Sequence, residues 1–124
     1  MGDDSPINTS YQLNILLTES TVLTIGKLGV FNFPAGRYVY TGSAKRNIEA
    51  RIARHLRQEK KLKWHIDYLL ASSSASVIKV TKSTIAECEL NRHTRGVNLV
   101  KGFGASDCCA GCGSHLKYDA GSET

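Results

Sequence analysis

The chain has 124 residues, with 16 Lys or Arg against 11 Asp or Glu, a formal net charge of +5, and a hydrophobic fraction of 41%. This length predicts one domain with its own core rather than two domains. The longest apolar runs, "ILL" and "YLL", are far too short to cross a bilayer, which excludes a membrane-spanning helix.

The N-terminal half predicts a flexible lead, residues 1–9, followed by three strands. The lead has no apolar stretch of the kind that directs secretion, so a cytoplasmic location is expected. "YQLNILL" (11–17) alternates apolar and polar residues, as a strand with one buried face does. "VLTIGKLGVFNF" (22–33) predicts a second strand that is broken or bulged at its glycines, and "YVYT" (38–41) a third after the turn "PAGR". Short connections between the three predict an antiparallel meander.

An amphipathic helix is predicted after the third strand. Ile48, Ile52 and Leu56 recur every four residues and therefore share one stripe, with Ser43 or Asn47 as the N-cap. At 100° per residue, Arg51 and His55 fall on the border between this stripe and the solvent face, where a site is usually built. Arg54 and Arg57 point away from the stripe. We therefore expect these two arginines to meet only solvent or phosphate.

Positive charge is concentrated between Lys45 and Lys63, where eight basic residues stand against Glu49 and Glu59. A dense basic patch is typical of proteins that bind a polyanion, because neutralised phosphates release their counterions. A solvated helix without a partner is the alternative interpretation. The residues predicted to bind nucleic acid are Lys45, Arg46, Arg54, Arg57, Lys60, Lys61 and Lys63.

The second half of the chain predicts two more helices and two more strands. "KLKWHIDYLLA" (61–71) is expected to be a helix that buries Leu62, Ile66, Leu69 and Leu70. His65 beside Trp64 is either a structural residue or an accessory member of a site. "SVIKVTK" (76–82) predicts a fourth strand, and "HLKY" (115–118) a last one before a flexible tail, residues 119–124. A single domain is thus expected over residues 10–118.

A third helix is predicted to start at Ser83 or Thr84. Glu87 stands three residues after Thr84, the spacing of a capping box, so its carboxylate either closes that box or does chemistry. Glu89 is either solvated or a second candidate carboxylate.

Cysteines cluster near the C-terminus. Cys109, Cys112 and His115 follow a C-x-x-C-x-x-H spacing that permits zinc, with the fourth ligand drawn from Cys108, Cys88 or His93. Reduced thiols without a metal are the alternative expectation for a cytoplasmic protein. Asp107 and His115 either complete a site or order the C-terminal loop.

Several motifs together resemble a known family. "Y-x-Y-x-G-S-A" followed by a helix with "R-I-x-x-H" resembles the signature of the GIY-YIG nucleases. More closely, the segments "GRYVYTGSA", "EARIARHLRQEKKLKWHIDYLL", "ECEL", "GFGASDC" and "SHL" resemble a related branch of small prokaryotic and archaeal domains of unknown function, some of them joined to endonuclease III. The resemblance extends from Tyr11 to Tyr118. It implies an α/β domain of the α+β type, with a central, mainly antiparallel sheet flanked by about three helices.

The resemblance also implies an activity: divalent-metal-dependent hydrolysis of phosphodiester bonds in DNA, with a DNA-repair protein as a possible partner. It assigns Tyr40 and Tyr11 to the two signature tyrosines, the former acting on the attacking water, and Gly42 to the turn before the helix. Ser10 and Thr9 stand where the family has isoleucine and glycine, so the first half of the signature is degraded.

Three further residues take roles from the same resemblance. Arg51 is expected to stabilise charge on the phosphate, and His55 to hydrogen-bond the nucleophile or a phosphate oxygen. Glu87, followed by Leu90 at the family's spacing, is expected to bind the metal in preference to Glu89.

Elementary chemistry makes similar demands. Phosphodiester hydrolysis needs a positioned water, a proton acceptor and positive charge near the phosphate oxygens. One carboxylate and several waters suit Mg²⁺ or Mn²⁺. A tyrosine titrates near pH 10, so a basic tyrosine is expected to need its pKa lowered by Arg51 and His55. The alternatives are a non-catalytic nucleic-acid-binding module of the same fold and a zinc-stabilised adaptor for a repair protein.

Overall fold

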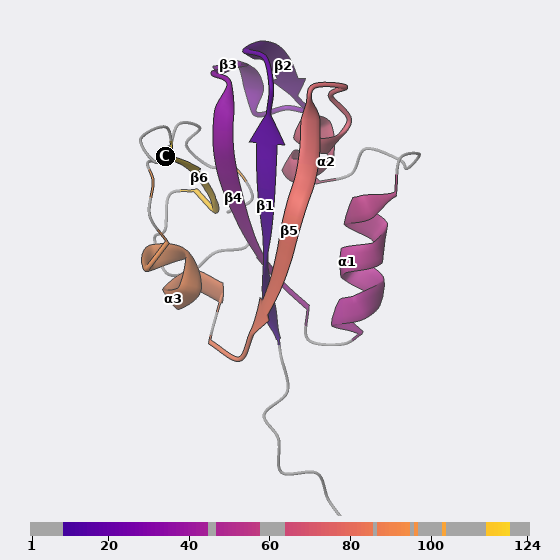
Figure 1. Cartoon of the computed structure of the whole chain (residues 1–124), viewed down its shortest axis with the longest axis vertical. Coiled ribbons are helices and arrows are strands. Elements are labelled where there is room, and N and C mark those ends of the chain that lie inside the picture. Colours follow the sequence, from indigo (N-terminus) through magenta and orange to yellow (C-terminus); the bar gives the residue numbers. More distant parts are fainter. Residues whose placement is uncertain are drawn as a thin grey trace, which may run out of the picture.

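The computed structural model of the chain describes residues 9–44, 47–57, 64–85, 87–94, 96, 103 and 114–119 (Figure 1). These residues form an α+β domain with a mainly antiparallel sheet and three helices, as predicted. No helix among them is long and apolar enough to cross a membrane. The elements are β1 (Ser10–Leu17), β2 (Thr21–Ile25), β3 (Gly29–Phe33), β4 (Gly36–Ser43), α1 (Ile48–Leu56), α2 (His65–Leu70), β5 (Ala75–Ser83), α3 (Glu87–Arg92) and β6 (Leu116–Asp119).

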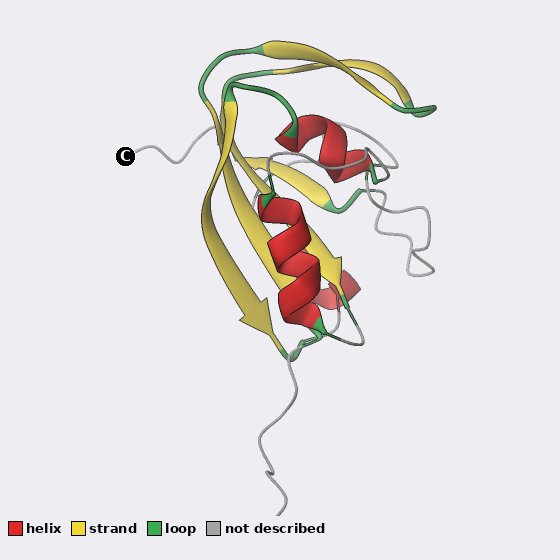
Figure 2. Ribbon diagram, turned by 90° about the vertical axis from the view of Figure 1, so that its right-hand side faces the viewer, coloured by secondary structure: helices red, strands yellow, loops and turns green. Residues whose placement is uncertain are grey.

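Four strands form the central sheet in the order β5-β1-β4-β6, and every neighbouring pair is antiparallel. The alternation predicted for β1 is confirmed, since Tyr11, Leu13, Ile15 and Leu17 are all buried on one face. Figure 2 shows α1 and α2 on the same side of this sheet. The core therefore lies between β1 and β4 on one side and these two helices on the other, where Ile52, Ile66 and Leu69 are buried.

The predicted meander is wrong. Residues 22–33 form a hairpin rather than one bulged strand, because β2 and β3 pair with each other in a separate sheet. Gly26 and Gly29 have φ values of 50° and 131°, which glycine adopts readily and which let the chain reverse between the two strands. The hairpin extends over α2 (Figure 2), and β4 returns to pair directly with β1.

Helix α1 begins as predicted but buries a different face. The side chain of Asn47 accepts a hydrogen bond from the Ala50 N–H, which confirms Asn47 as the N-cap. Leu56, expected in the core, is 48% exposed, whereas His55 is only 2% exposed. The buried face is thus rotated toward His55, and this residue lies in the core rather than at its border.

Arg54 does not point only to solvent, so that prediction is wrong. Its guanidinium makes two hydrogen bonds to the carboxylate of Asp67, at 3.0 and 3.1 Å. Asp67 is fully buried in α2 and also accepts the backbone N–H of Trp64 at 2.8 Å. A buried carboxylate requires such partners, and Arg54 supplies the compensating charge.

The remaining elements agree with the prediction in kind. The strands expected over residues 76–82 and 115–118 are present as β5 and β6, and β6 continues to Asp119. Thr9, expected in the flexible lead, is already paired, since its N–H donates to the Ser83 carbonyl. Ile66 and Leu69 of α2 are buried as predicted, while Leu62 lies outside the described residues.

Candidate functional site

The candidate site is built at the C-terminal end of β4, between α1 and α3 (Figure 1). Side chains of a strand alternate between its faces, so Tyr40 and Gly42 share the face that α1 covers, while Thr41 and Ser43 share the other. Contacts confirm this division, because Tyr40 packs against His55 of α1 and Ser43 bonds to Glu87 of α3. The end of β4 therefore joins two helices that would otherwise be separated by the sheet.

Gly42 is not a turn residue, contrary to the prediction. It lies within β4, directly opposite Tyr11 of β1. A Cβ atom at this position would lie 2.5 Å from the hydroxyl oxygen of Tyr11 and 2.6 Å from its Cζ. Glycine is required here because the Tyr11 ring occupies the space of a side chain.

Tyr11, Tyr40 and His55 form the inner part of the site. The hydroxyl of Tyr11 lies 2.7 Å from His55 Nε2, a short hydrogen bond between two side chains that are almost completely buried. The Tyr40 ring meets the same imidazole edge-on, with 5.9 Å between ring centroids. Within the described part of the chain, the Tyr40 hydroxyl has no hydrogen-bond partner, and this residue is 8% exposed.

The pKa values of both tyrosines move opposite to the prediction. Burial raises the pKa of Tyr11 to about 12, although the positive charge of Arg51 acts in the other direction. Burial also raises the pKa of Tyr40 well above its usual range, assisted by the neighbouring Tyr11 and Glu87. Desolvation of a phenolate outweighs the nearby arginine. Both hydroxyls are therefore neutral at physiological pH, and neither is a phenolate base.

Arg51 is half-buried and held from two directions. Its Nη1 donates to the Ser43 carbonyl at 3.3 Å, and its Cζ lies 4.7 Å from the centroid of the Trp64 ring. Arg54 stacks on the same ring with its Cζ at 4.2 Å. Trp64 thus contacts both guanidiniums and restricts the orientation of Arg51 through cation–π attraction.

Glu87 reaches the site from the first residue of α3. One carboxylate oxygen accepts the Ser43 hydroxyl at 2.7 Å, and the other lies 2.7 Å from Nδ1 of His115. The predicted capping box is wrong, because both oxygens bond to other elements and Thr84 is not their partner. Burial would raise the pKa of Glu87, but the hydrogen bonds from His115 and Ser43, and the charges of His115 and Arg51, lower the pKa below its usual range. The carboxylate is ionised and ties α3 to β4 and to His115, the residue before β6.

The alternative carboxylate, Glu89, does not join this cluster. Its side chain is 61% exposed, and it lies 3.8 Å from His93 one helical turn later. His65, a predicted accessory residue, packs against Phe103 with ring centroids 5.6 Å apart. Neither Glu89 nor His65 has a described contact with Tyr11, Arg51 or Glu87.

The residues present fit a divalent ion bound by one carboxylate. No group of three or more His, Cys, Asp or Glu side chains in the described ranges is arranged to hold a metal. Glu87 nevertheless offers an ionised carboxylate with 25% of its side chain exposed. Mg²⁺ keeps most of its waters and often takes a single protein carboxylate together with substrate phosphate, and Mn²⁺ also favours oxygen ligands. Glu87 is the residue that would hold it.

Several predicted residues lie outside the described part of the chain. They include most of the basic stretch, the acidic accessory residue and three cysteines of the predicted zinc set: Lys45, Arg46, Lys60, Lys61, Lys63, Asp107, Cys108, Cys109 and Cys112. Arg57 is described and exposed at the end of α1. His115 belongs to both the accessory and the zinc predictions, and its structure links it to Glu87.

Comparison with known families gives one match. The model of a family described as "Domain of unknown function DUF123" matches residues 10–124. The chain belongs to this family. Neither the curated proteins nor the solved structures contain a match. The DUF123 domain therefore covers every element of the fold and every residue of the candidate site.

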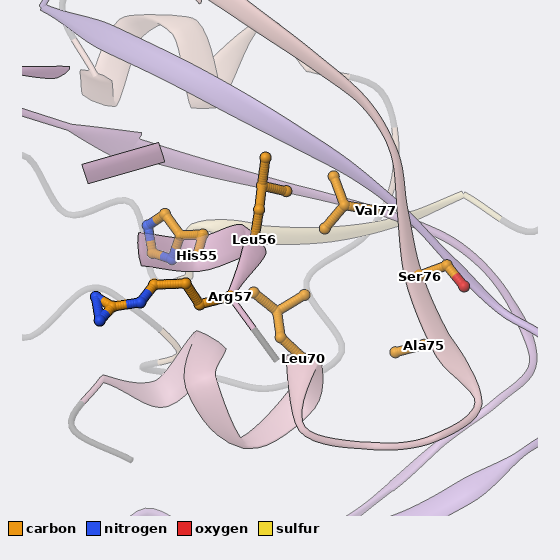
Figure 3. Close-up of a pocket in the computed structure, with 7 residues that line it drawn as sticks. All are labelled: His55, Leu56, Arg57, Leu70, Ala75, Ser76 and Val77. Atoms are coloured by element: carbon orange, nitrogen blue, oxygen red, sulfur yellow. The ribbon is translucent and has the colours of Figure 1, made fainter. Parts of the chain in front are cut away.

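The DUF123 domain also has a pocket of about 240 Å³ beside the site. It lies where the last residues of α1 and α2 face the start of β5 (Figure 3). Of the predicted catalytic residues, only His55 contributes to its lining, together with Leu56, Arg57, Leu70, Ala75, Ser76 and Val77. The pocket is separate from Tyr11, Arg51 and Glu87.

Three residues important to this arrangement were not predicted. Ser43, expected only as a cap, bonds to both Arg51 and Glu87. Phe103 is fully buried, packs edge-on against Tyr40, and its carbonyl accepts the His115 N–H at 2.8 Å. Trp64 holds Arg51. The isolated Trp and the aromatic residue in "GFGASDC" were visible signals, because buried aromatics anchor loops, but their partners depend on tertiary structure.

Proposed function

We propose that this DUF123 domain is a divalent-metal-dependent endonuclease that hydrolyses phosphodiester bonds in DNA and belongs to the GIY-YIG superfamily. The observation that supports this most strongly is that the predicted catalytic and metal-binding side chains converge on one part of the fold. Five residues from four elements meet through a chain of contacts around Ser43 and His55: Tyr11, Tyr40, Arg51, His55 and Glu87. Titratable residues, buried or half-buried, that converge from several elements on one part of the fold are typical of a site.

Arg51 and Glu87 supply opposite charges at the outer part of the site. The Ser43 carbonyl and the Trp64 ring orient Arg51, so its guanidinium is prepared to pair with the non-bridging oxygens of a phosphate. Glu87 stays ionised and would hold Mg²⁺ or Mn²⁺, which adds positive charge against the same phosphate when bound. Both side chains bond to Ser43, so the arginine and the carboxylate are available to the same phosphate.

The tyrosine hydroxyls act as neutral hydrogen-bonding groups. The Tyr40 hydroxyl has no described partner and is the one available to orient a water molecule. As the water oxygen bonds to phosphorus, its proton passes to the Tyr11 oxygen while Tyr11 gives its own proton to His55 Nε2, 2.7 Å away. The bond from phosphorus to the leaving oxygen breaks, and that oxygen takes a proton from solvent. This relay leaves the proton on His55 and avoids a free phenolate, although burial disfavours a charged imidazole as well as a charged phenolate.

The basic stretch between Lys45 and Lys63 binds the nucleic acid. The protein acts in the cytoplasm, together with a DNA-repair protein. Arg57 extends this stretch from the described end of α1. Arg54 is removed from the proposed docking set, because its guanidinium is engaged by the Asp67 carboxylate.

A non-catalytic nucleic-acid-binding module is the second candidate. The observation that favours it is the burial of Tyr11 and His55, which are 1% and 2% exposed, together with the degraded first half of the signature. In this case the Tyr11–His55 hydrogen bond only stabilises the core, and the basic stretch still binds DNA.

A cleavage and binding assay separates the two candidates. Branched, nicked and plain duplex DNA are incubated with wild type and with Arg51→Ala, first in Mg²⁺ and then in Mn²⁺. The nuclease predicts metal-dependent cleavage that falls by about 100-fold or more in Arg51→Ala, as for loss of one transition-state contact. Absence of cleavage on all three substrates, with binding that weakens steeply as salt rises, identifies the module instead.

A further inference from the structure

Strand β5 forms one outer edge of the central sheet, and the nuclease proposal does not use it. It pairs with β1 on one side, and no strand in the described part of the chain pairs with it on the other. With 9 residues, it is the longest of the described strands. An open edge presents a row of backbone N–H and C=O groups that can pair with a further extended chain. Strand β5 is therefore the described strand best suited to accept one more.

The pocket of about 240 Å³ lies against the start of this edge (Figure 3). Leu56, Leu70, Ala75 and Val77 give it apolar walls, and Leu56 is 48% exposed. Sites for small molecules usually enclose about 300 Å³ or more. The smaller pocket here suits a single apolar side chain, such as an extended peptide presents at alternate residues.

The charged residues of β5 and of the pocket lining are all basic. Strand β5 carries Lys79 and Lys82 but no Asp or Glu, and Arg57 lines the pocket. Lys82 is paired with Glu49 of α1. Lys79, in contrast, is exposed and makes no ion pair with any other described residue. Charge complementarity at this edge therefore favours an acidic partner over a basic one.

The strand register places the pocket and Lys79 on opposite faces of the sheet. Val77 stands opposite Ile15, which is buried in the core, whereas Lys79 stands opposite Asn14. Side chains of an added strand also alternate between the two faces. Such a strand would direct an apolar side chain toward the helices and acidic side chains toward Lys79.

Pairing of β5 with a second copy of itself is disfavoured. In a symmetric antiparallel pair about the middle of β5, Lys79 of one copy faces Lys79 of the other, and like charges directly opposite each other destabilise a sheet. Ile78 is an extra residue at the register shift between β1 and β5, and a bulge twists an edge away from flat pairing with another sheet. A short peptide can follow this twist, whereas a second folded sheet cannot.

We propose that β5 binds an extended peptide of another protein, in which one apolar residue enters the pocket between α1, α2 and β5 and acidic residues face Lys79. Backbone hydrogen bonds along β5 provide affinity, while the pocket and Lys79 provide selectivity. The peptide extends the four-stranded sheet by one strand. This inference does not rest on nuclease activity, because it uses none of the residues assigned to catalysis or to the metal.

Binding of a designed peptide to the full chain tests the proposal. The probe has the 9-residue length of β5; valine and glutamate alternate along it, and leucine replaces the central valine. One control peptide carries lysine in place of glutamate, and another is methylated at its backbone nitrogens. Fluorescence anisotropy is expected to show binding of the glutamate peptide, about 10-fold weaker binding of the lysine peptide, and none of the methylated peptide.

Three variants connect binding to β5 and the pocket. Lys79→Glu is expected to weaken binding of the glutamate peptide by about 5–10-fold and to strengthen binding of the lysine peptide by a similar factor, because an exposed ion pair is exchanged for a like-charge contact. Leu56→Ala is expected to weaken both peptides by about 5-fold, since the pocket loses one wall. Lys27→Glu, a matched change at an exposed lysine between β2 and β3, is expected to leave both affinities unchanged.

Amide hydrogen exchange on wild type remains decisive if a variant does not fold. The glutamate peptide is expected to slow exchange in residues 75–83, and slowing only elsewhere would overturn the proposal. No binding of the glutamate peptide at about 1 mM, or equal binding of the methylated peptide, would overturn it as well. Two further results would assign the edge to another occupant: weaker DNA binding by Lys79→Glu without peptide binding, or a wild-type dimer that the peptide does not dissociate. Cleavage of DNA is not measured, so failure of the nuclease proposal does not affect the result.

Discussion

The absence of a side chain at Gly42 leaves the space that the Tyr11 ring occupies in the inner part of the site. The Tyr11 ring lies where a Cβ of residue 42 would stand, and its hydroxyl reaches His55 from that position. Any other residue at position 42 displaces the ring and lengthens this hydrogen bond. The sequence identified the glycine but misassigned its role, because a glycine in a strand and a glycine in a turn look alike until the facing residue is known.

Gly42→Ala is expected to lower the free energy of unfolding by about 1–3 kcal/mol, the usual cost of overpacking a core. Urea denaturation measures this change. Thr24→Ala, at an exposed position of the β2–β3 hairpin, is the control and is expected to change stability much less. A Gly42→Ala protein as stable as wild type would mean that Tyr11 moves without cost.

The ionisation of Glu87 is expected to make the stability of the domain depend on pH in the acidic range. Its pKa is lowered from the ordinary value of 4.5, so the ionised form stabilises the fold above about pH 4.5, and this contribution is lost as the pH falls through the lowered value. Glu87→Gln lacks this contribution, so its stability is expected to decline less than that of wild type on acidification. Denaturation at a series of pH values from neutral to acidic measures the difference. Glu89→Gln serves as the control, and an equal effect of the two variants would contradict this explanation.

Helix α1 illustrates what periodicity predicts at the scale of an element. The helix and its Asn47 cap follow from local sequence, and Ile52 is buried as expected. The angular position of Arg54 did not reveal its partner, because Asp67 belongs to α2 and approaches only in the folded state. A prediction of solvent exposure from the periodicity of α1 alone is wrong where α2 covers the polar side of the helix.

The two arginines of α1 are therefore expected to behave differently. Arg54→Ala leaves the buried Asp67 without its charged partner and is expected to cost roughly 3 kcal/mol of stability, as measured by urea denaturation. Arg57→Ala is the matched variant on the exposed end of the helix. Because Arg57 is exposed and neutralises no buried carboxylate in the described part of the chain, this change is expected to cost less stability than Arg54→Ala and to reduce the salt dependence of DNA binding by about one phosphate contact. Equal destabilisation by the two changes would contradict the structural role of Arg54.

At the scale of the whole molecule, the fold class and the positions of β1, β4, β5 and β6 followed from the sequence, but the division of residues 22–33 into two strands and the pairing of the strands did not. Alternation identifies strands and their buried faces, as in β1 and β4, yet it does not determine which strands pair. The hairpin of residues 21–33 was mistaken for part of the main sheet because its glycines are compatible with either a bulge or a reversal. The candidate site shows the same limit. Tyr11, Tyr40, Arg51, His55 and Glu87 were all identified from motifs, whereas Ser43 and Trp64 required three-dimensional contacts.

The proposed nuclease requires Glu87, and not its helix neighbour Glu89, for metal-dependent cleavage. Initial rates of DNA cleavage at increasing Mg²⁺ concentration, compared for wild type, Glu87→Gln and Glu89→Gln, test this most directly. Glu87 bonds into the site, while Glu89 is exposed beside His93. Glu87→Gln is expected to lose cleavage by about 100-fold or more while still binding DNA, as for removal of a group that stabilises the transition state. Glu89→Gln is expected to match wild type. Equal rates for Glu87→Gln and wild type at every Mg²⁺ concentration would contradict the account.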